Sequence, residues 1–97
     1  MTSKTCRLSP LAEADLEDIW FYTLERWSLN QADKYVRDLV STFEDLAASR
    51  AHGRNTTVRK GYLKHACGSH LIYFRDRGDW LEVVRILHGA QDVERHL

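Results

Sequence analysis

Basic and histidine side chains, the groups that cleave a phosphodiester without a metal, lie mostly in the second half of this 97-residue chain. Such cleavage needs a base for the attacking hydroxyl, an acid for the leaving oxygen and cations for the developing phosphate charge. Arg85 stands within an apolar run, where a charge is costly unless it reaches solvent or a partner. The alternative for Arg85 is a structural position on a helix-free sheet face. The candidates are Arg59, Lys60, Lys64, His65, Arg85 and His88.

Metal or nucleophile chemistry has weaker support. His65, Cys67 and His70 are three possible ligands within six residues, but they straddle a predicted turn and have no fourth ligand nearby. Cys6 and Cys67 form no CxxC motif and are expected to pack as small apolar side chains. The five glycines are scattered through turns rather than gathered in a phosphate-binding loop. We therefore expect no metal and no cofactor.

Charge is distributed unevenly although the formal net charge is zero. Residues 1–48 contain nine acidic and five basic residues, whereas residues 49–97 contain five acidic and nine basic ones. This asymmetry predicts one acidic and one basic face, and the basic face would suit an acidic partner. A solvated surface without a partner is the alternative. The expected cationic surface comprises Arg59, Lys64, Arg75 and Arg85.

The length predicts a single domain over residues 1–97, because domains typically need about 50–200 residues each. No run approaches the roughly 18 apolar residues of a membrane helix, and the first ten residues lack the apolar segment of a signal peptide. We expect a cytoplasmic protein that does not act at a membrane.

The first half of the chain should form two helices. Ser9 can cap a helix over residues 10–27, with Pro10 in the first turn. Asn30 can cap a second helix, with Asp33 reaching back to it, and the short gap between the two forces an antiparallel hairpin. The predicted buried stripes are Ala12, Leu16, Ile19, Trp20, Thr23 and Trp27 in the first helix, and Ala32, Tyr35, Val36, Leu39, Val40, Phe43, Leu46 and Ala47 in the second.

The second half changes to a strand pattern. We predict strands over residues 58–67 (bent at Gly61), 70–75 and 80–88, joined by turns at 68–69 and 76–79. In the last strand Leu81, Val83, Arg85 and Leu87 should share one face. With a short strand at residues 4–8 and a final turn over 93–96, capped by Asp92, the class is α+β: β-α-α-β-β-β, a helix hairpin on a small antiparallel sheet.

Several segments in this order resemble the ParE/RelE toxin superfamily, and its ParE branch in particular. They are LSP at 8–10 with Ala12, Asp15 and Leu16, GSHLIYFR at 68–75, VRILHGA at 84–90 with Asp92, and ERHL at 94–97. The resemblance covers nearly the whole chain. It implies the toxin of a bacterial type II toxin–antitoxin pair, held in a hetero-oligomer by a cognate ParD-like antitoxin.

The resemblance also implies a target. ParE-like toxins inhibit DNA gyrase by binding, so gyrase is the expected target and any contact with DNA is indirect, through gyrase or the antitoxin. RelE-like relatives cleave messenger RNA on the ribosome. A RelE-like ribonuclease using Lys64, Arg85 and His88, or a decayed toxin that only binds antitoxin, are the alternatives. RNA-cleaving relatives place an arginine after the last strand and a tyrosine near the C-terminus, whereas this chain has residues 89–91 as GAQ and ends with His96, so we expect no catalytic residues.

Two aromatic residues break the polar pattern of the first helix. Phe21 lies about 150° from the centre of the buried stripe, and Tyr22 lies about 110° away in the other direction. Large exposed aromatics indicate an interaction patch. We expect Phe21 to be mostly exposed in the isolated subunit and covered in a complex, with Tyr22 as a second contact unless the sheet edge buries it.

Overall fold

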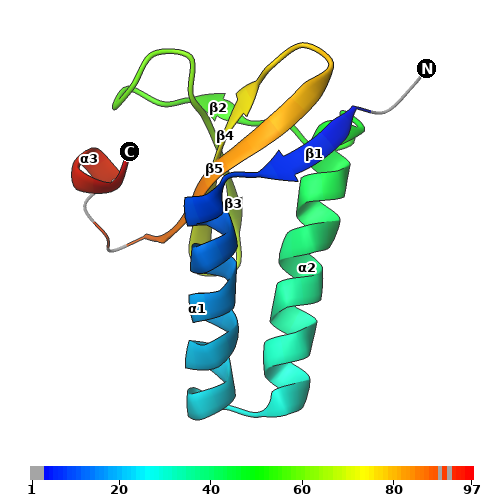
Figure 1. The fold of residues 1–97 in the computed structure, drawn as a ribbon, viewed down its shortest axis with the longest axis vertical. Coiled ribbons are helices and arrows are strands. Elements are labelled where there is room, and N and C mark those ends of the chain that lie inside the picture. Colours follow the sequence, from blue (N-terminus) through cyan, green and yellow to red (C-terminus); the bar gives the residue numbers. More distant parts are fainter. Residues whose placement is uncertain (1–3, 90, 92) are drawn as a thin grey trace.

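The computed structural model describes residues 4–89, 91 and 93–97, and within them the chain folds as an α+β domain (Figure 1). A five-stranded sheet has the order β1-β5-β4-β3-β2, in which β1 is parallel to β5 and the other neighbours are antiparallel. The elements are β1 (Thr5–Leu8), α1 (Pro10–Arg26), α2 (Leu29–Ala47), β2 (Arg54–Asn55), β3 (Leu63–Cys67), β4 (His70–Asp76), β5 (Trp80–His88) and α3 (Val93–His96).

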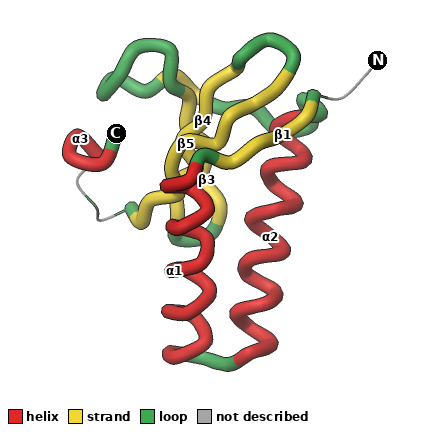
Figure 2. The backbone as a smooth tube through the Cα atoms, in the orientation of Figure 1, coloured by secondary structure: helices red, strands yellow, loops and turns green. Residues whose placement is uncertain are grey.

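The helices α1 and α2 form the expected antiparallel hairpin, and their connecting turn lies at the end remote from β1 (Figure 2). Ser9 caps α1 as predicted: its hydroxyl accepts from the Ala12 amide at 3.0 Å and donates to the Val84 carbonyl at 2.7 Å. The same side chain therefore starts the helix and fastens it to β5. The last turn over residues 93–96 is also helical as predicted, whereas Asp92, its expected cap, lies outside the described residues.

The start of α2 differs from the prediction. Ser28, not Asn30, is the N-cap, because its hydroxyl accepts from the Gln31 amide at 3.1 Å and leaves Asn30 inside the first turn. Asp33 does not form a capping box; its carboxylate accepts a hydrogen bond from the Trp20 indole at 2.9 Å. The hydrogen bond between Trp20 and Asp33 therefore joins α1 to α2.

The buried stripes are correct except at two positions. Trp27 is 73% exposed, since α1 ends at Arg26 and the backbone of Trp27 leaves the helical path. Val40 is 38% exposed at the margin of the α2 stripe. Stripe residues from both helices pack against one face of the sheet. The core consists of Ala12, Ile19, Leu39, Phe43, Leu46, Ala47, Ile72, Phe74, Leu81, Val83 and Ile86.

The strand predicted over residues 58–67 forms only in its second half. The Val58 amide bonds to the Thr56 hydroxyl at 3.2 Å, and Gly61 has a φ of +85°, so this stretch turns before β3 begins. The two-residue strand β2 was not predicted. The hairpin at residues 76–79 is confirmed: Gly78 takes a φ of +93° there and its amide donates to Asp76 at 2.9 Å.

A bulge in β5 changes which side chains face the helices. Phe74 pairs with Val83 but Tyr73 pairs with Arg85, so Val84 is an extra residue that reverses the alternation. Ile86 therefore joins the helix-covered core with Val83. The prediction that Arg85 and Leu87 share a face with Leu81 and Val83 is wrong beyond the bulge.

Candidate functional site

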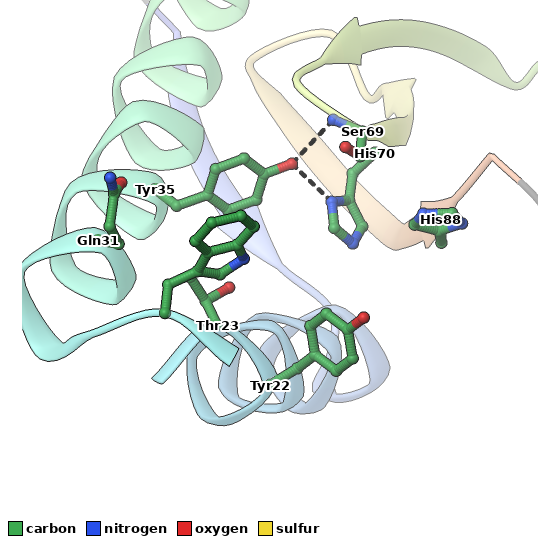
Figure 3. Close-up of a pocket in the computed structure, with 8 residues that line it drawn as sticks. Tyr22, Thr23, Gln31, Tyr35, Ser69, His70 and His88 are labelled. Carbon is green, nitrogen blue, oxygen red and sulfur yellow. Dashed lines mark hydrogen bonds between the residues drawn. The ribbon is translucent and has the colours of Figure 1, made fainter. Parts of the chain in front are cut away.

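A cleft lies between the helix hairpin and the strand ends that carry the β3–β4 turn and the end of β5 (Figure 3). It has a volume of about 290 Å³, and a neighbouring hollow of about 320 Å³ shares Tyr22, His70 and His88 with it. Its described lining contains aromatic, hydroxyl, amide and imidazole groups but no lysine or arginine. The lining residues are Tyr22, Thr23, Trp27, Gln31, Tyr35, Ser69, His70 and His88.

The hydroxyl of Tyr35 organises the inner wall of this cleft. It accepts from the Ser69 amide at 3.0 Å and lies 2.7 Å from Nδ1 of His70 (Figure 3). When the Tyr35 hydroxyl donates its proton to Nδ1, His70 carries its own proton on Nε2. Burial is the main cause that raises the pKa of Tyr35, so the phenol stays protonated at neutral pH. This side chain thereby fixes the β3–β4 turn against α2.

Gly68 allows this close approach. A methyl group at its Cα would lie 2.6 Å from the Tyr35 hydroxyl, and its φ of +58° is in the left-handed region that favours glycine. The wall of the cleft is therefore preformed by backbone geometry as well as by hydrogen bonds.

Two imidazoles meet at the same wall. The rings of His70 and His88 are 5.5 Å apart, edge to face. Burial, followed by the proximity of His88, lowers the pKa of His70, while Asp15 opposes this shift. His70 is therefore neutral at pH 7. Such a pair has the acid and base types needed for phosphodiester cleavage, but the described lining offers no lysine or arginine for the developing phosphate charge.

A separate ion pair lies at the junction of α1 and β5. Asp15 accepts from Arg85 Nε at 2.7 Å, from Arg85 Nη2 at 2.8 Å and from the Ile86 amide at 2.9 Å. Both charged side chains are 13% exposed. Asp15 lies at the edge of β5, beyond Val83, which is the last residue that pairs with β1. Its hydrogen bond to Arg85 is the main cause that raises the pKa of Arg85. The pair joins the helix hairpin to the sheet.

The residues from 6 to 93 match the family model described as the ParE toxin of a type II toxin–antitoxin system, parDE. The chain belongs to the ParE toxin family. It is 42% identical to Toxin ParE1 of Mycobacterium tuberculosis over 93% of this chain and 94% of the relative. It is 40% identical to Toxin ParE1 of Caulobacter vibrioides, over 97% of this chain and 98% of the relative.

Solved structures show the same fold. A chain of the chromosomal ParDE system from P. aeruginosa matches with a TM-score of 0.78 at 22% identity, covering 89% of this chain and 96% of that one. A chain of the RelBE2 complex from Mycobacterium tuberculosis matches with a TM-score of 0.67 at 20% identity, covering 94% and 97%. The α+β class and the resemblance to the ParE/RelE superfamily are thus confirmed, and this is a ParE-type toxin of a toxin–antitoxin system.

The residues proposed for an RNA-cleaving alternative do not form one site around this ParE cleft. His88 lines it, whereas Lys64 lies on β3 and Arg85 is engaged with Asp15. The alternative of a structural position for Arg85 on the sheet face that the helix hairpin does not cover is confirmed, because Arg85 pairs with Tyr73 on the face opposite Ile86. Its charge is compensated by Asp15 of α1 and not by solvent or another protein. Arg85 also donates to the His96 carbonyl at 3.1 Å, which ties α3 to β5.

Two residues of the predicted cationic surface meet at a buried tyrosine. The guanidinium groups of Arg59 and Arg75 each lie 5.0 Å from the Tyr62 ring centroid, and Arg59 donates to the Leu97 carbonyl at 2.7 Å. Lys64 lies on the neighbouring strand, opposite Tyr73. Arg85 contributes less charge to this surface than expected, since Asp15 neutralises it.

The aromatic residues of α1 lie as the helical wheel predicts. Phe21 is 48% exposed and Tyr22 is 59% exposed. Tyr22 lines the cleft, and the Arg26 guanidinium lies over its ring outside the lining, 5.6 Å from the ring centroid. The sheet edge therefore does not bury Tyr22. Sequence reasoning missed Tyr35 as a site residue, because it fitted the buried stripe of α2, and treated His70 only as a possible metal ligand.

The histidine and cysteine cluster is dispersed. His65 Nδ1 lies 3.0 Å from the His52 carbonyl, Cys67 lies 3.5 Å from the Thr42 hydroxyl, and His70 faces Tyr35. Within the described part of the chain, no group of three or more His, Cys, Asp or Glu is placed to hold a metal ion. None of the described helices is long and apolar enough to cross a membrane.

Proposed function

We propose that this ParE-type toxin acts in the bacterial cytoplasm by binding DNA gyrase, without cleaving RNA, and that a cognate ParD-like antitoxin neutralises it. Membership of the ParE family is the observation that carries the proposal. Contact with DNA then comes only through gyrase or the antitoxin.

The chemistry of the cleft supports binding over catalysis. Metal-free RNA cleavage develops negative charge on phosphate, and enzymes that perform it place cations there. The described lining of the cleft has no lysine or arginine, and Arg85 is held by two hydrogen bonds to Asp15. The groups that could move protons are present without the groups that would stabilise the transition state.

Two readouts in cells test this proposal. The toxin is expressed from an inducible promoter while a DNA-damage reporter and the integrity of messenger RNA are followed separately. Purified gyrase is then tested for supercoiling in the presence of the toxin. We expect a damage response, intact messages and inhibited supercoiling; healthy cells with active gyrase would instead indicate a toxin that has lost its activity.

The edge contact between His70 and His88 favours one competing function, a ribosome-dependent ribonuclease. Loss of a general acid or base costs about 10²–10⁴ in rate, so His88→Ala would abolish toxicity in a ribonuclease. We expect His88→Ala to stay folded and toxic. A folded but harmless variant, together with cleaved messages in the wild type, would decide for the ribonuclease.

The antitoxin is proposed to place an acidic segment on the cationic surface of Arg59, Lys64 and Arg75. Opposite charges speed encounter more than they slow dissociation. Raising the salt concentration should therefore lower the association rate constant more than it changes the dissociation rate constant, as measured by surface plasmon resonance. An association rate that does not respond to salt would refute this mode of capture.

A further inference from the structure

The helix hairpin and the rest of the chain carry opposite charge. Residues 10–47 contain nine acidic and three basic residues, whereas all the other residues together contain five acidic and eleven basic ones. A partner that binds only the cationic surface needs acidic residues alone. The hairpin is negatively charged. A partner that also contacts the hairpin therefore needs a second segment that is positively charged.

The cleft gives that second segment a place to dock. Its mouth is formed by Trp27 and Tyr22, which are 73% and 59% exposed. Its volume of about 290 Å³ is at the low end for ligand pockets, which suits one bulky side chain. The Tyr35 and Gly68 contacts already hold the inner wall, so little ordering is needed on binding.

Carboxylates at the rim of the cleft favour a positively charged segment. Asp18 lines the adjoining hollow, and Glu25 follows Tyr22 at a spacing that places both on one face of α1. Arg26 is the basic residue of this face, and its guanidinium stacks on the Tyr22 ring. The described lining of the cleft itself contains no lysine or arginine. A basic segment thus meets carboxylates at the rim and aromatic rings at the mouth.

We infer that the cleft anchors one bulky apolar side chain, carried on a basic segment of the cognate antitoxin that is distinct from its acidic segment. This inference rests on the proposed function for the identity of the partner. The antitoxin then binds its toxin through two surfaces of opposite charge. Large side chains buried at an interface in this way contribute most of the binding energy.

Variants of the rim and the mouth test the two parts of this assignment in the complex with full-length antitoxin. Trp27→Ser should raise the dissociation rate constant at least tenfold, because it removes a wall of the anchor pocket without touching the core. Asp18→Lys should lower the association rate constant at least threefold. The matched controls are Leu11→Ser, at an exposed apolar residue of the first turn of α1, and Glu44→Lys, at an exposed carboxylate of α2; each should change the rate constants less than twofold.

Overlapping peptides from the antitoxin identify the occupant. The peptide that shifts the indole N–H resonance of Trp27 should carry lysine or arginine around one large apolar residue, and its effect should disappear in Tyr22→Ser. An acidic peptide at this position, or rate constants unchanged in Trp27→Ser and Asp18→Lys, would overturn the inference alone. Wild-type toxin that binds no antitoxin would overturn the proposed function, and toxin that dimerises through Trp27 in sedimentation would make a second copy the occupant.

Discussion

Removing the carboxylate of Asp15 should destabilise the fold far more than its position near a helix start suggests. Asp15→Asn keeps the size of the side chain but removes the charge that faces Arg85, and it cannot accept all three hydrogen bonds at 2.7, 2.8 and 2.9 Å. The guanidinium is then left 13% exposed without its counter-charge. Removing one partner of a buried ion pair costs about 3–5 kcal/mol of the free energy of unfolding. Because this pair keeps some exposure, we expect a cost of about 3 kcal/mol.

A loss of this size is large for a small domain. A chain of 97 residues is typically stable by about 5–15 kcal/mol, and each kcal/mol shifts the melting temperature by about 4–8 °C. We expect Asp15→Asn to lower the melting temperature by roughly 12–24 °C. Urea denaturation is the appropriate assay for the free energy of unfolding, because guanidinium salts would screen the ion pair.

A double-mutant cycle with Arg85→Met isolates the pair from other effects. The double variant should be less destabilised than the sum of the single variants, since neither charge is then left alone. Lys4→Ala is the control, because the Lys4–Asp76 pair is exposed at 33% and 50% and should contribute less than about 1 kcal/mol. A loss below about 1 kcal/mol in Asp15→Asn, or additive single variants, would refute the argument.

Three further outcomes are expected. Gly68→Ala should lower the free energy of unfolding in urea by about 1–3 kcal/mol and more than Gly61→Ala, because both have positive φ but only Gly68 faces the Tyr35 hydroxyl; equal losses would contradict the steric reason. The pKa of His70 is lowered in the folded state, so the unfolded state binds its proton more readily and the free energy of unfolding should fall as pH drops below 6.5; His70→Gln should flatten this slope between pH 7 and 5, and an unchanged slope would exclude His70 as its source. Phe21→Ser should weaken antitoxin binding in calorimetry by roughly tenfold, with monomer stability nearly unchanged, since burying a phenylalanine contributes about 1.5–3 kcal/mol; an unfolded monomer would show that Phe21 serves the toxin's own core.

The parts of the fold that local patterns determine were predictable from the sequence. Ser9 before Pro10 marks the start of α1. The strand over Trp80–His88 is marked by its own apolar residues and by the turn at residues 76–79 directly before it. The start of α2 was missed because Ser28 and Asn30 are both good N-caps. Asp33, which would complete a capping box with Asn30, instead accepts from Trp20 of the other helix, and this contact is not visible in the sequence.

The parts that depend on distant segments were not predictable. The bulge at Val84 exists because of how β5 pairs with β4, and no residue within β5 signals it. Arg85 was recognised as anomalous, but its partner lies 70 residues earlier, on a helix. The cleft likewise combines α1, α2 and two strand ends, so Tyr35 had the pattern of an ordinary core residue until the β3–β4 turn was placed beside it.

The parallel pairing of β1 with β5 has a consequence for synthesis. The strand β1 (Thr5–Leu8) pairs with β5 (Trp80–His88), which the ribosome adds after both long helices and three other strands. A nascent chain that stops before this point lacks Leu81, Val83 and Ile86, and with them much of the apolar surface on which the helices pack. Prematurely terminated products therefore cannot assemble the toxin fold. The sheet and the helices that cover it therefore come together only after β5 has been synthesised.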